Sequence, residues 1–167
     1  MSVGPPVAHD MLAHEREAWS RGLSRVAGVD EAGRGPLAGP VVAAALVMPA
    51  DFAQREMGLS LRGLTDSKKL SANQREVFYR ILQNSSEVHI GLGLCDQLEI
   101  DQLNILRATH LAMARALSLL PELPELALVD GLPVDGLPCP SNAIVRGDSA
   151  SLSIAAASII AKVERDR

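Results

Sequence analysis

The chain from residue 25 onward consists of short apolar runs separated by turn residues. Residues 25–29 (RVAGV) and 41–48 (VVAAALVM) are apolar runs of strand length, which predicts two buried strands. Residues 87–94 alternate weakly between apolar and polar side chains and fit a third strand. Two shorter runs, 126–129 and 143–145, predict two further strands, and the first of them ends at an aspartate.

Helical patterns separate these predicted strands. Ser71 followed by Gln74 has the form of a capping box, which predicts a helix through about Leu82. From about residue 101 to Pro121, apolar positions recur at steps of three and four and form one stripe: Leu103, Leu106, His110, Met113, Leu117 and Leu120. Residues 149–167 read as an apolar helix. Strands that alternate with helices indicate an α/β fold.

The first 24 residues differ from this pattern. They begin with Gly4, Pro5 and Pro6, and residues 10–19 have room for only one or two charged helical turns. We therefore expect residues 1–24 to be a mobile extension and residues 25–167 to form the folded domain. The length of 167 residues and the 47% hydrophobic content are sufficient for one domain with its own core and exclude disorder.

Composition also narrows the class of protein. No uncharged stretch reaches the roughly 18 to 20 apolar residues of a membrane span, and no secretory signal pattern is visible, so we expect a cytoplasmic protein without membrane contact. Cys95 and Cys139 lie far apart without a CxxC pattern, which favours buried thiols over a disulfide or zinc site. The formal net charge of −4 excludes bulk electrostatic attraction to nucleic acid, so any such contacts must be local.

Four acidic residues stand where predicted strands or the turns after them end: Asp30, Glu31, Asp130 and Asp148. Carboxylate oxygens are the ligands that Mg²⁺ and Mn²⁺ prefer, and two such ions roughly 3.5 to 4 Å apart can support phosphodiester hydrolysis. Asp30 and Glu31 fit one site only if the chain bends, because strand neighbours point to opposite faces. Gly33 and Gly35 supply the freedom to bend. The alternative is that these are ordinary turn carboxylates and that Asp148 caps the last helix.

The amino-acid sequences of five segments, and their order along the chain, resemble the ribonuclease HII family, the type 2 ribonucleases H of bacteria. The segments are residues 29–41 (VDEAGRGPLAGPV), 66–70 (DSKKL), 104–109 (NILRAT), 128–131 (LVDG), and 147–148 (GD) with 153–163 (SIAAASIIAKV). The resemblance implies a ribonuclease H-like fold, which is a mixed sheet flanked by helices.

The resemblance also implies a function. It implies a metal-dependent endoribonuclease that hydrolyses the RNA strand of RNA–DNA hybrids and incises duplex DNA on the 5′ side of embedded ribonucleotides. Two-metal-ion catalysis with Mg²⁺ or Mn²⁺ would leave a 3′-OH and a 5′-phosphate. The expected partners are RNA–DNA hybrid and ribonucleotide-containing DNA, with a sliding clamp as a further candidate, and the expected oligomeric state is a monomer.

The family pattern assigns the metal-binding and catalytic roles to Asp30, Glu31, Asp130 and Asp148. A second VDG, which contains Asp135 and ends at Gly136, competes for the third position, but the apolar run leads directly into Asp130. The tripeptide Gly33, Arg34 and Gly35 resembles the element that recognises the ribonucleotide 2′-OH, where glycines let the backbone reach a sugar hydroxyl. A tight turn would explain the glycines equally well, though not Arg34.

The remaining matches imply contacts to the nucleic acid backbone. They fall on Ser67, Lys68, Lys69 and Lys162, with Asn104 and Ser158 as weaker candidates. The three lysines are the only ones in the chain, which supports local charge contacts. A solvated charge pair remains the alternative for Lys68 and Lys69, and Asn104 and Ser158 could instead satisfy a helix.

The resemblance stops at Arg167, whereas family members normally continue through a helical region with a tyrosine that stacks on the sugar beside the junction. Tyr79, the only tyrosine, lies too early in the chain for that part. We therefore expect Ile154, Ile159 and Ile160 to be partly exposed. A second hypothesis follows, in which a truncated, weakly active or inactive chain binds hybrid duplex without cutting it.

Overall fold

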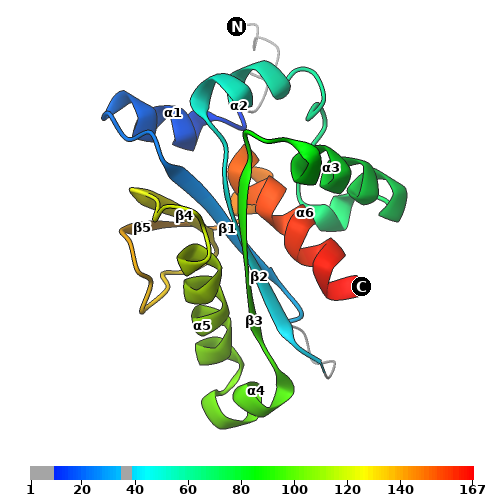
Figure 1. The fold of residues 1–167 in the computed structure, drawn as a ribbon, viewed down its shortest axis with the longest axis vertical. Coiled ribbons are helices and arrows are strands. Elements are labelled where there is room, and N and C mark those ends of the chain that lie inside the picture. Colours follow the sequence, from blue (N-terminus) through cyan, green and yellow to red (C-terminus); the bar gives the residue numbers. More distant parts are fainter. Residues whose placement is uncertain (1–9, 35–38) are drawn as a thin grey trace, which may run out of the picture.

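A mixed five-stranded sheet forms the centre of the molecule, seen here in a computed structural model that describes residues 10–34 and 39–167 (Figure 1). The strand order is β3-β2-β1-β4-β5. The strands are β1 (Val26–Ala32), β2 (Val41–Val47), β3 (His89–Cys95), β4 (Leu126–Asp130) and β5 (Ser141–Ile144). The first three strands pair antiparallel, and β4 and β5 extend the sheet in parallel with β1.

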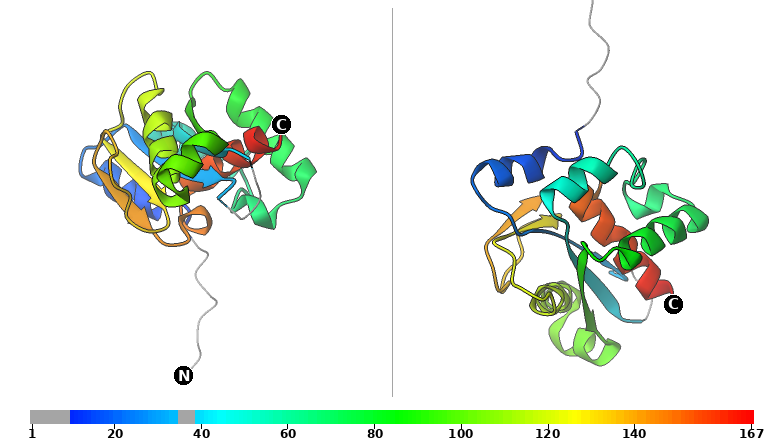
Figure 2. Two further views of the ribbon diagram at one scale, coloured as in Figure 1. Left: turned by 90° about the horizontal axis from the view of Figure 1, so that it is seen from below. Right: turned by 45° about the horizontal axis from the view of Figure 1, so that its top comes forward.

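Helices cover both faces of this sheet (Figures 1 and 2). On one face α6 (Leu152–Asp166) packs on β1 and β2 and is flanked by α3 (Ala72–Asn84), while α5 (Ile105–Ser118) covers β2 and β3 on the other. The shorter elements are α1 (Ala13–Ser20), α2 (Ala50–Glu56), α4 (Gln97–Leu103) and the 3₁₀ turns η1 (Ser67–Lys69) and η2 (Gly147–Ser149). The predicted α/β architecture, a mixed sheet flanked by helices, is confirmed.

Small residues let both helices lie directly on the sheet. Successive residues of β2 alternate between the two cores, so that Ala44 faces the α6 side and Ala43 faces the α5 side. A Cβ atom on Gly28 of β1 would lie 2.1 Å from the backbone carbon of Ser153 in α6. A Cβ atom on Gly93 of β3 would lie 1.9 Å from the backbone oxygen of Ala112 in α5. The sheet therefore has no room for side chains at these two crossings.

Three predicted helices are present with corrected bounds. The capping box of Ser71 and Gln74 opens α3 as predicted. The segment predicted as one helix from about residue 101 is two helices, because Asn104 adopts φ +75° between α4 and α5. The Asn104 side chain accepts a hydrogen bond from the backbone N–H of Arg107 and so caps α5. The last helix begins at Leu152, with Ser151 as its cap.

The expectation of a mobile extension over residues 1–24 is wrong for residues 10–24, while residues 1–9 lie outside the described part of the chain. Leu12 and Ala18 are fully buried, and α1 packs beside β1. The expected exposure of the isoleucines in α6 is also wrong, because Ile154, Ile159 and Ile160 are fully buried. No helix among the described residues is long and apolar enough to cross a membrane.

The amino-terminal segment caps the first turn of α6. The backbone N–H of Leu152 donates to the carbonyl oxygen of Met11 at 2.7 Å. Glu15 of α1, which is 2% exposed, accepts hydrogen bonds from the backbone N–H of Ser153 at 3.0 Å and from the hydroxyls of Ser151 and Ser153 at 2.9 and 2.7 Å. These contacts satisfy N–H groups that a helix leaves unpaired at its start, and they place a negative charge at the positive end of the helix.

Replacing Glu15 with alanine is expected to lower the free energy of unfolding by about 2 to 4 kcal/mol, because three buried donors lose their acceptor. Glu17→Ala on the exposed side of the same helix, where Glu17 pairs with Arg21 at 3.1 Å, is the matched control. It should change stability by less than about 0.5 kcal/mol. Chemical denaturation followed by circular dichroism measures both variants, and equal losses would contradict a capping role for Glu15.

Candidate metal centre at the strand ends

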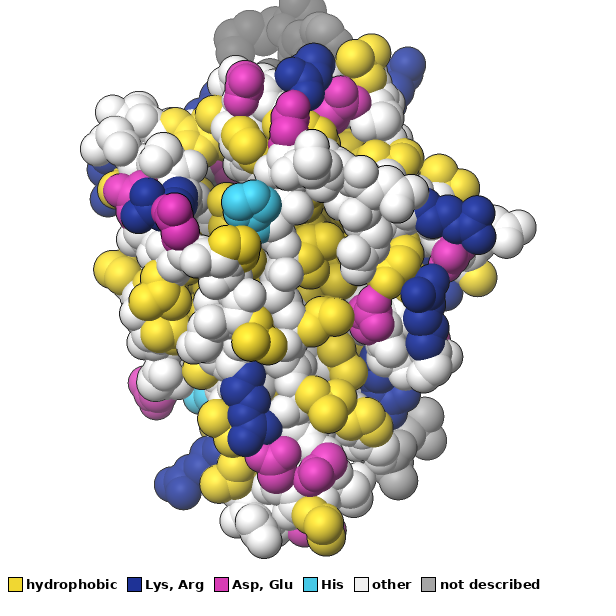
Figure 3. Space-filling view, in the orientation of Figure 1, with side chains coloured by type: hydrophobic (Ala, Val, Ile, Leu, Met, Phe, Trp, Pro, Cys, Tyr) yellow, Lys and Arg dark blue, Asp and Glu magenta, His cyan; other side chains and the backbone are white. Residues whose placement is uncertain are grey.

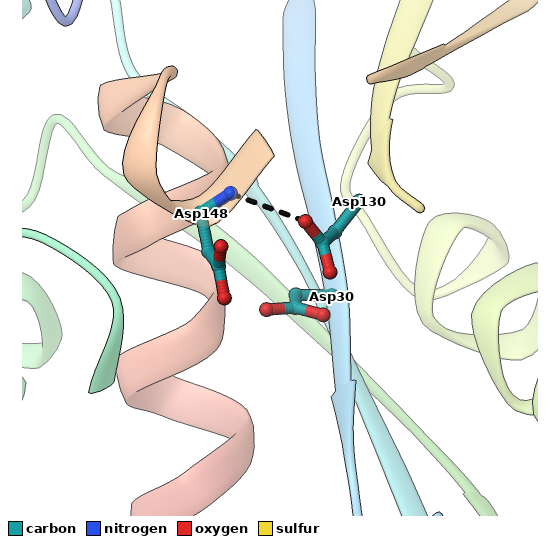
Figure 4. Close-up of side chains that lie close together, drawn as sticks. All are labelled: Asp30, Asp130 and Asp148. Carbon is teal, nitrogen blue, oxygen red and sulfur yellow. Dashed lines mark hydrogen bonds between the residues drawn. The ribbon is translucent and has the colours of Figure 1, made fainter. Parts of the chain in front are cut away.

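Three carboxylates converge where the parallel strands β1 and β4 end (Figure 4). Val29 of β1 is paired with Val129 of β4, so Asp30 and Asp130 are the next residues on neighbouring strands and share one face of the sheet. Asp148 comes from the η2 turn after β5, and its backbone N–H donates to Asp130 Oδ1 at 3.2 Å. One carboxylate oxygen from each aspartate lies within 4.8 Å of the other two. The fold thus brings together three acidic residues that are distant in sequence.

Glu31 lies on the opposite face of β1. The strand continues regularly to Ala32, which pairs with Val42, so the chain does not bend at residues 30 and 31. The Glu31 carboxylate lines a cavity of about 50 Å³, together with Asp130 and with residues of α5. Its Oε2 atom is buried and has no hydrogen-bond partner among the described residues, and its Oε1 atom lies 4.0 Å from Nη1 of Arg34. Glu31 therefore reaches the same strand ends from the other side.

Burial and mutual repulsion disfavour ionisation of these carboxyl groups. Burial, followed by repulsion from Glu31 and Asp130, raises the pKa of Asp30 well above its usual range. Burial is also the main cause that raises the pKa of Glu31. For Asp148, burial and repulsion from Asp130 and Asp66 raise the pKa to about 6. Clustered carboxylates with a buried unpaired oxygen fit a hard divalent cation, which would offset the repulsion.

These pKa shifts predict how metal-free protein responds to pH. An acid whose pKa is raised in the folded state stabilises the fold below its unfolded pKa, and that stabilisation is lost as the pH rises through the folded pKa. For Asp148 the loss runs from about pH 4, the usual pKa of an aspartate, to about pH 6. Saturating Mn²⁺ is therefore expected to raise the melting temperature by about 5 to 10 °C at about pH 7.5 and by much less at about pH 5.

Differential scanning fluorimetry with and without Mn²⁺ measures this shift at both pH values. Asp148→Asn should lose most of the Mn²⁺-induced shift at the higher pH. This variant distinguishes binding at Asp148 from binding of Mn²⁺ to histidines, which also becomes stronger as the pH rises. Asp135→Asn, which changes an exposed aspartate, should keep the shift. A shift that is the same at both pH values would contradict carboxylate binding of the ion.

The DSKKL segment lies beside the carboxylates. The backbone N–H of Ser67 donates to Oγ of Ser158 at 3.3 Å, and both residues are buried, so they tie η1 to α6. Lys68 and Lys69 are exposed, and Nζ of Lys69 donates to Oγ of Ser149 beside Asp148 at 3.1 Å. The two lysines thus lie on the surface next to the carboxylate cluster.

The other predicted substrate contacts have different local surroundings. Gly33 adopts φ +91° directly after β1, and the side chain of Arg34 is half exposed. Gly35 lies outside the described residues. Lys162 pairs with Asp166 one turn along α6 at 3.1 Å, and the exposed Asn104 caps α5. Each of these last two side chains therefore has a partner within or beside its own helix.

The structure also places residues at the site that the sequence reasoning missed. The carboxyl group of Asp66 raises the pKa of Asp148, so a further acidic residue adjoins the cluster. His110, predicted as a packed core residue, lines the Glu31 cavity with Thr109. The apolar periodicity of α5 did not indicate this position of His110, because it does not show which turns of the helix pack on the sheet and which turns extend past the strand ends. Asp66 was visible only as the first residue of DSKKL.

Surface charge on one face of the molecule is mixed. Lys and Arg side chains lie next to Asp and Glu side chains on the face shown in Figure 3. Ion pairs among the described residues include Arg55 with Glu87 at 3.3 Å and Arg115 with Glu99 at 2.7 Å. This agrees with the acidic total and with local rather than bulk electrostatic contacts to any polyanion.

Comparison with known proteins gives consistent matches. Residues 27–167 match the family model described as Ribonuclease HII. Ribonuclease HII from Acetivibrio thermocellus is 48% identical over 158 residues, which cover 95% of this chain and 59% of that protein. The chain spans about three fifths of the length of the curated relatives that it matches.

Solved structures give the same assignment. The ribonuclease H2 from Pyrococcus horikoshii OT3 aligns with a TM-score of 0.71 and 33% identity, over 86% of this chain and 72% of that chain. The structure of the PCNA:RNase HII complex from Archaeoglobus fulgidus contains a match with a TM-score of 0.67 and 29% identity, over 86% of this chain and 73% of that chain. The predicted ribonuclease H-like fold is thereby confirmed, and the chain belongs to the ribonuclease HII family.

Proposed function

We propose that this protein is a metal-dependent endoribonuclease that hydrolyses the RNA strand of RNA–DNA hybrids and incises duplex DNA at embedded ribonucleotides. The observation that carries the proposal is the convergence of Asp30, Asp130 and Asp148 within 4.8 Å at the ends of two parallel strands. Membership of the ribonuclease HII family supports the same activity.

Asp30, Asp130 and Asp148 would hold divalent cations, Mg²⁺ or Mn²⁺, and Glu31 would add a ligand from the other side of β1. When bound, two such ions supply an activated water molecule and stabilise the charge on the leaving oxygen. The hydrogen bond from the Asp148 backbone to Asp130 and the burial of Asp30 hold these side chains in place in advance, so little reorganisation is needed.

Hydrolysis would take place on the 5′ side of a ribonucleotide. The oxygen of water forms a bond to phosphorus, the bond from phosphorus to the 3′ oxygen breaks, and the products are a 3′-OH and a 5′-phosphate. No side chain is required as a covalent nucleophile. The role of the carboxylates is to bind cations and, through them, to orient the scissile phosphate.

The proposed substrate contacts surround the metal centre. Lys68 and Lys69 would neutralise backbone phosphates beside Asp148, and proximity to Lys68 already lowers the pKa of that carboxyl group against the larger upward effects. Gly33, Arg34 and Gly35 would recognise the 2′-OH, the group that distinguishes RNA from DNA. We further propose that the protein acts as a cytoplasmic monomer. A sliding clamp is a candidate partner, because the Archaeoglobus fulgidus relative forms a complex with PCNA.

The test is incision of an end-labelled DNA duplex that carries one ribonucleotide, incubated with Mg²⁺ or Mn²⁺. The expected product is a single nick 5′ of the ribonucleotide, with no cut in an all-DNA duplex and none in the presence of EDTA. Circular dichroism establishes that the protein is folded. Folded protein that binds the duplex but leaves it intact at every ion concentration would support the second hypothesis, a binding chain without cleavage.

A further inference from the structure

Arg165, in the last turn of α6, lies across both ends of the loop that joins β1 to β2. Its Nε donates a hydrogen bond to the carbonyl oxygen of Pro40 at 3.1 Å. A Cβ atom on Gly33 would lie 2.3 Å from Nε of Arg165, and one on Gly39 would lie 2.9 Å from its Nη2. One guanidinium group therefore contacts the backbone at the beginning and at the end of the same loop.

The two glycines have a structural reason of their own. Gly33 and Gly39 adopt φ of +91° and +128°, a region that L side chains rarely enter. Each also leaves the space that the Arg165 side chain fills, so a larger residue at either position would displace the guanidinium. Gly39 is held further by its N–H, which donates to Oε1 of Gln97 at 3.1 Å. The loop ends are thus fixed by contacts from α6 and α4.

The neighbours of Arg165 on α6 have different partners. Glu164 bonds to the hydroxyl of Tyr79, and Asp166 pairs with Lys162. Arg167 stacks over the ring of Tyr79, with its Cζ 4.5 Å from the ring centroid. No carboxylate within the described ranges 10–34 and 39–167 forms an ion pair with Arg165, which is half-buried. Its charge and its planar donors are therefore directed at the loop rather than at an acidic side chain.

We propose that Arg165 is a positioning residue that fixes the backbone at Gly33 and thereby sets selectivity for single ribonucleotides. The inference rests on the proposed function of the Gly33 and Arg34 segment in reading the 2′-OH. The metal-binding side chains lie on other elements, so loss of Arg165 should leave the chemistry in place and loosen recognition. A lysine at this position keeps the charge but lacks the planar fork of donors, so Arg165→Lys separates positioning from attraction to phosphate.

The first arm of the experiment is independent of activity. Amide hydrogen exchange by NMR is measured at Gly33 and Gly39 in the full chain and in the variants Arg165→Met, Arg165→Lys and Arg167→Met. Both Arg165 variants should exchange about tenfold faster at these glycines, because local opening becomes easier. Arg167→Met, which changes an arginine of the same turn that packs on Tyr79, should leave both rates unchanged. Unchanged rates in Arg165→Met, or equal increases in Arg167→Met, would overturn the positioning role.

The second arm compares kcat/KM on a duplex with one ribonucleotide and on a continuous RNA–DNA hybrid. Both Arg165 variants should lose about tenfold on the single ribonucleotide and less than about threefold on the hybrid, where contacts are repeated along the RNA strand. An equal loss on both substrates would overturn the link to selectivity. Full retention by Arg165→Lys would overturn positioning by the planar donors, because the charge alone would then be sufficient. If the unsubstituted chain cuts neither substrate, the proposed function fails, whereas the exchange rates still decide whether Arg165 holds the loop.

Discussion

Asp130→Asn is expected to reduce metal-dependent cleavage at least about a thousandfold while leaving duplex binding largely intact. Asp130 has a carboxylate oxygen within 4.8 Å of those of Asp30 and Asp148, and its Oδ1 accepts a hydrogen bond from the backbone N–H of Asp148. Asparagine keeps the shape and one acceptor oxygen but removes the charge that a divalent ion requires. Single-turnover cleavage of the ribonucleotide duplex measures the loss, and electrophoretic mobility shift measures binding.

Asp135→Asn is the matched control for this variant. Asp135 is the aspartate of the second VDG of the chain, which competes with Asp130 for the third ligand position at the level of sequence, but its side chain is exposed in a loop. Its replacement should change cleavage by less than about twofold. Full activity in Asp130→Asn, or an equal loss in Asp135→Asn, would show that the metal centre has been assigned to the wrong aspartate.

Gly28→Ala is expected to destabilise the protein by about 3 kcal/mol or more, which corresponds to a fall in melting temperature of roughly 6 to 12 °C. A Cβ atom at this position would lie 2.1 Å from the carbon and 2.2 Å from the oxygen of the Ser153 backbone. Neither atom belongs to a flexible side chain, so α6 itself must move away from β1. Because Asp30 lies on β1 and Asp148 precedes α6, the same movement should weaken the Mn²⁺-induced stabilisation.

Gly58→Ala provides the comparison. Gly58 is exposed, has no atom within 4 Å of an added Cβ and does not adopt a positive φ. Alanine there should leave the stability within about 0.5 kcal/mol or raise it slightly, because it restricts the unfolded chain. Thermal unfolding followed by circular dichroism compares the two variants. Equal melting temperatures would contradict the close contact between α6 and β1.

Local signals in the sequence predicted the fold and part of the site. The apolar run that ends at Asp130 indicated a buried strand with a carboxylate at its end, and the structure has this arrangement. The pairing of Val29 with Val129, which aligns Asp30 with Asp130, depends on how distant strands meet and has no local signal. The candidate carboxylates could therefore be identified from the sequence, but their proximity in the fold could not.

The errors have the same origin. The charged residues around Glu15 suggested a mobile extension, and no local signal indicated burial, because the serines that bind Glu15 lie at the far end of the chain. The sequence suggested that Asp30 and Glu31 could share one site only if the chain bends, whereas the strand pairs regularly through Ala32 and the Glu31 side chain still interacts with that of Asp30. Arg165 belongs to a run of charged residues, and only the structure shows that it crosses the loop to Pro40. In each case a long-range contact decided the local role.

Cleavage as proposed requires the three aspartates to bind divalent cations, and anomalous diffraction from crystals grown with saturating Mn²⁺ tests this directly. The predicted result is an anomalous peak about 2 Å from carboxylate oxygens of Asp30, Asp130 and Asp148. Manganese bound only at other positions, with these three carboxylates left without a peak, would contradict it.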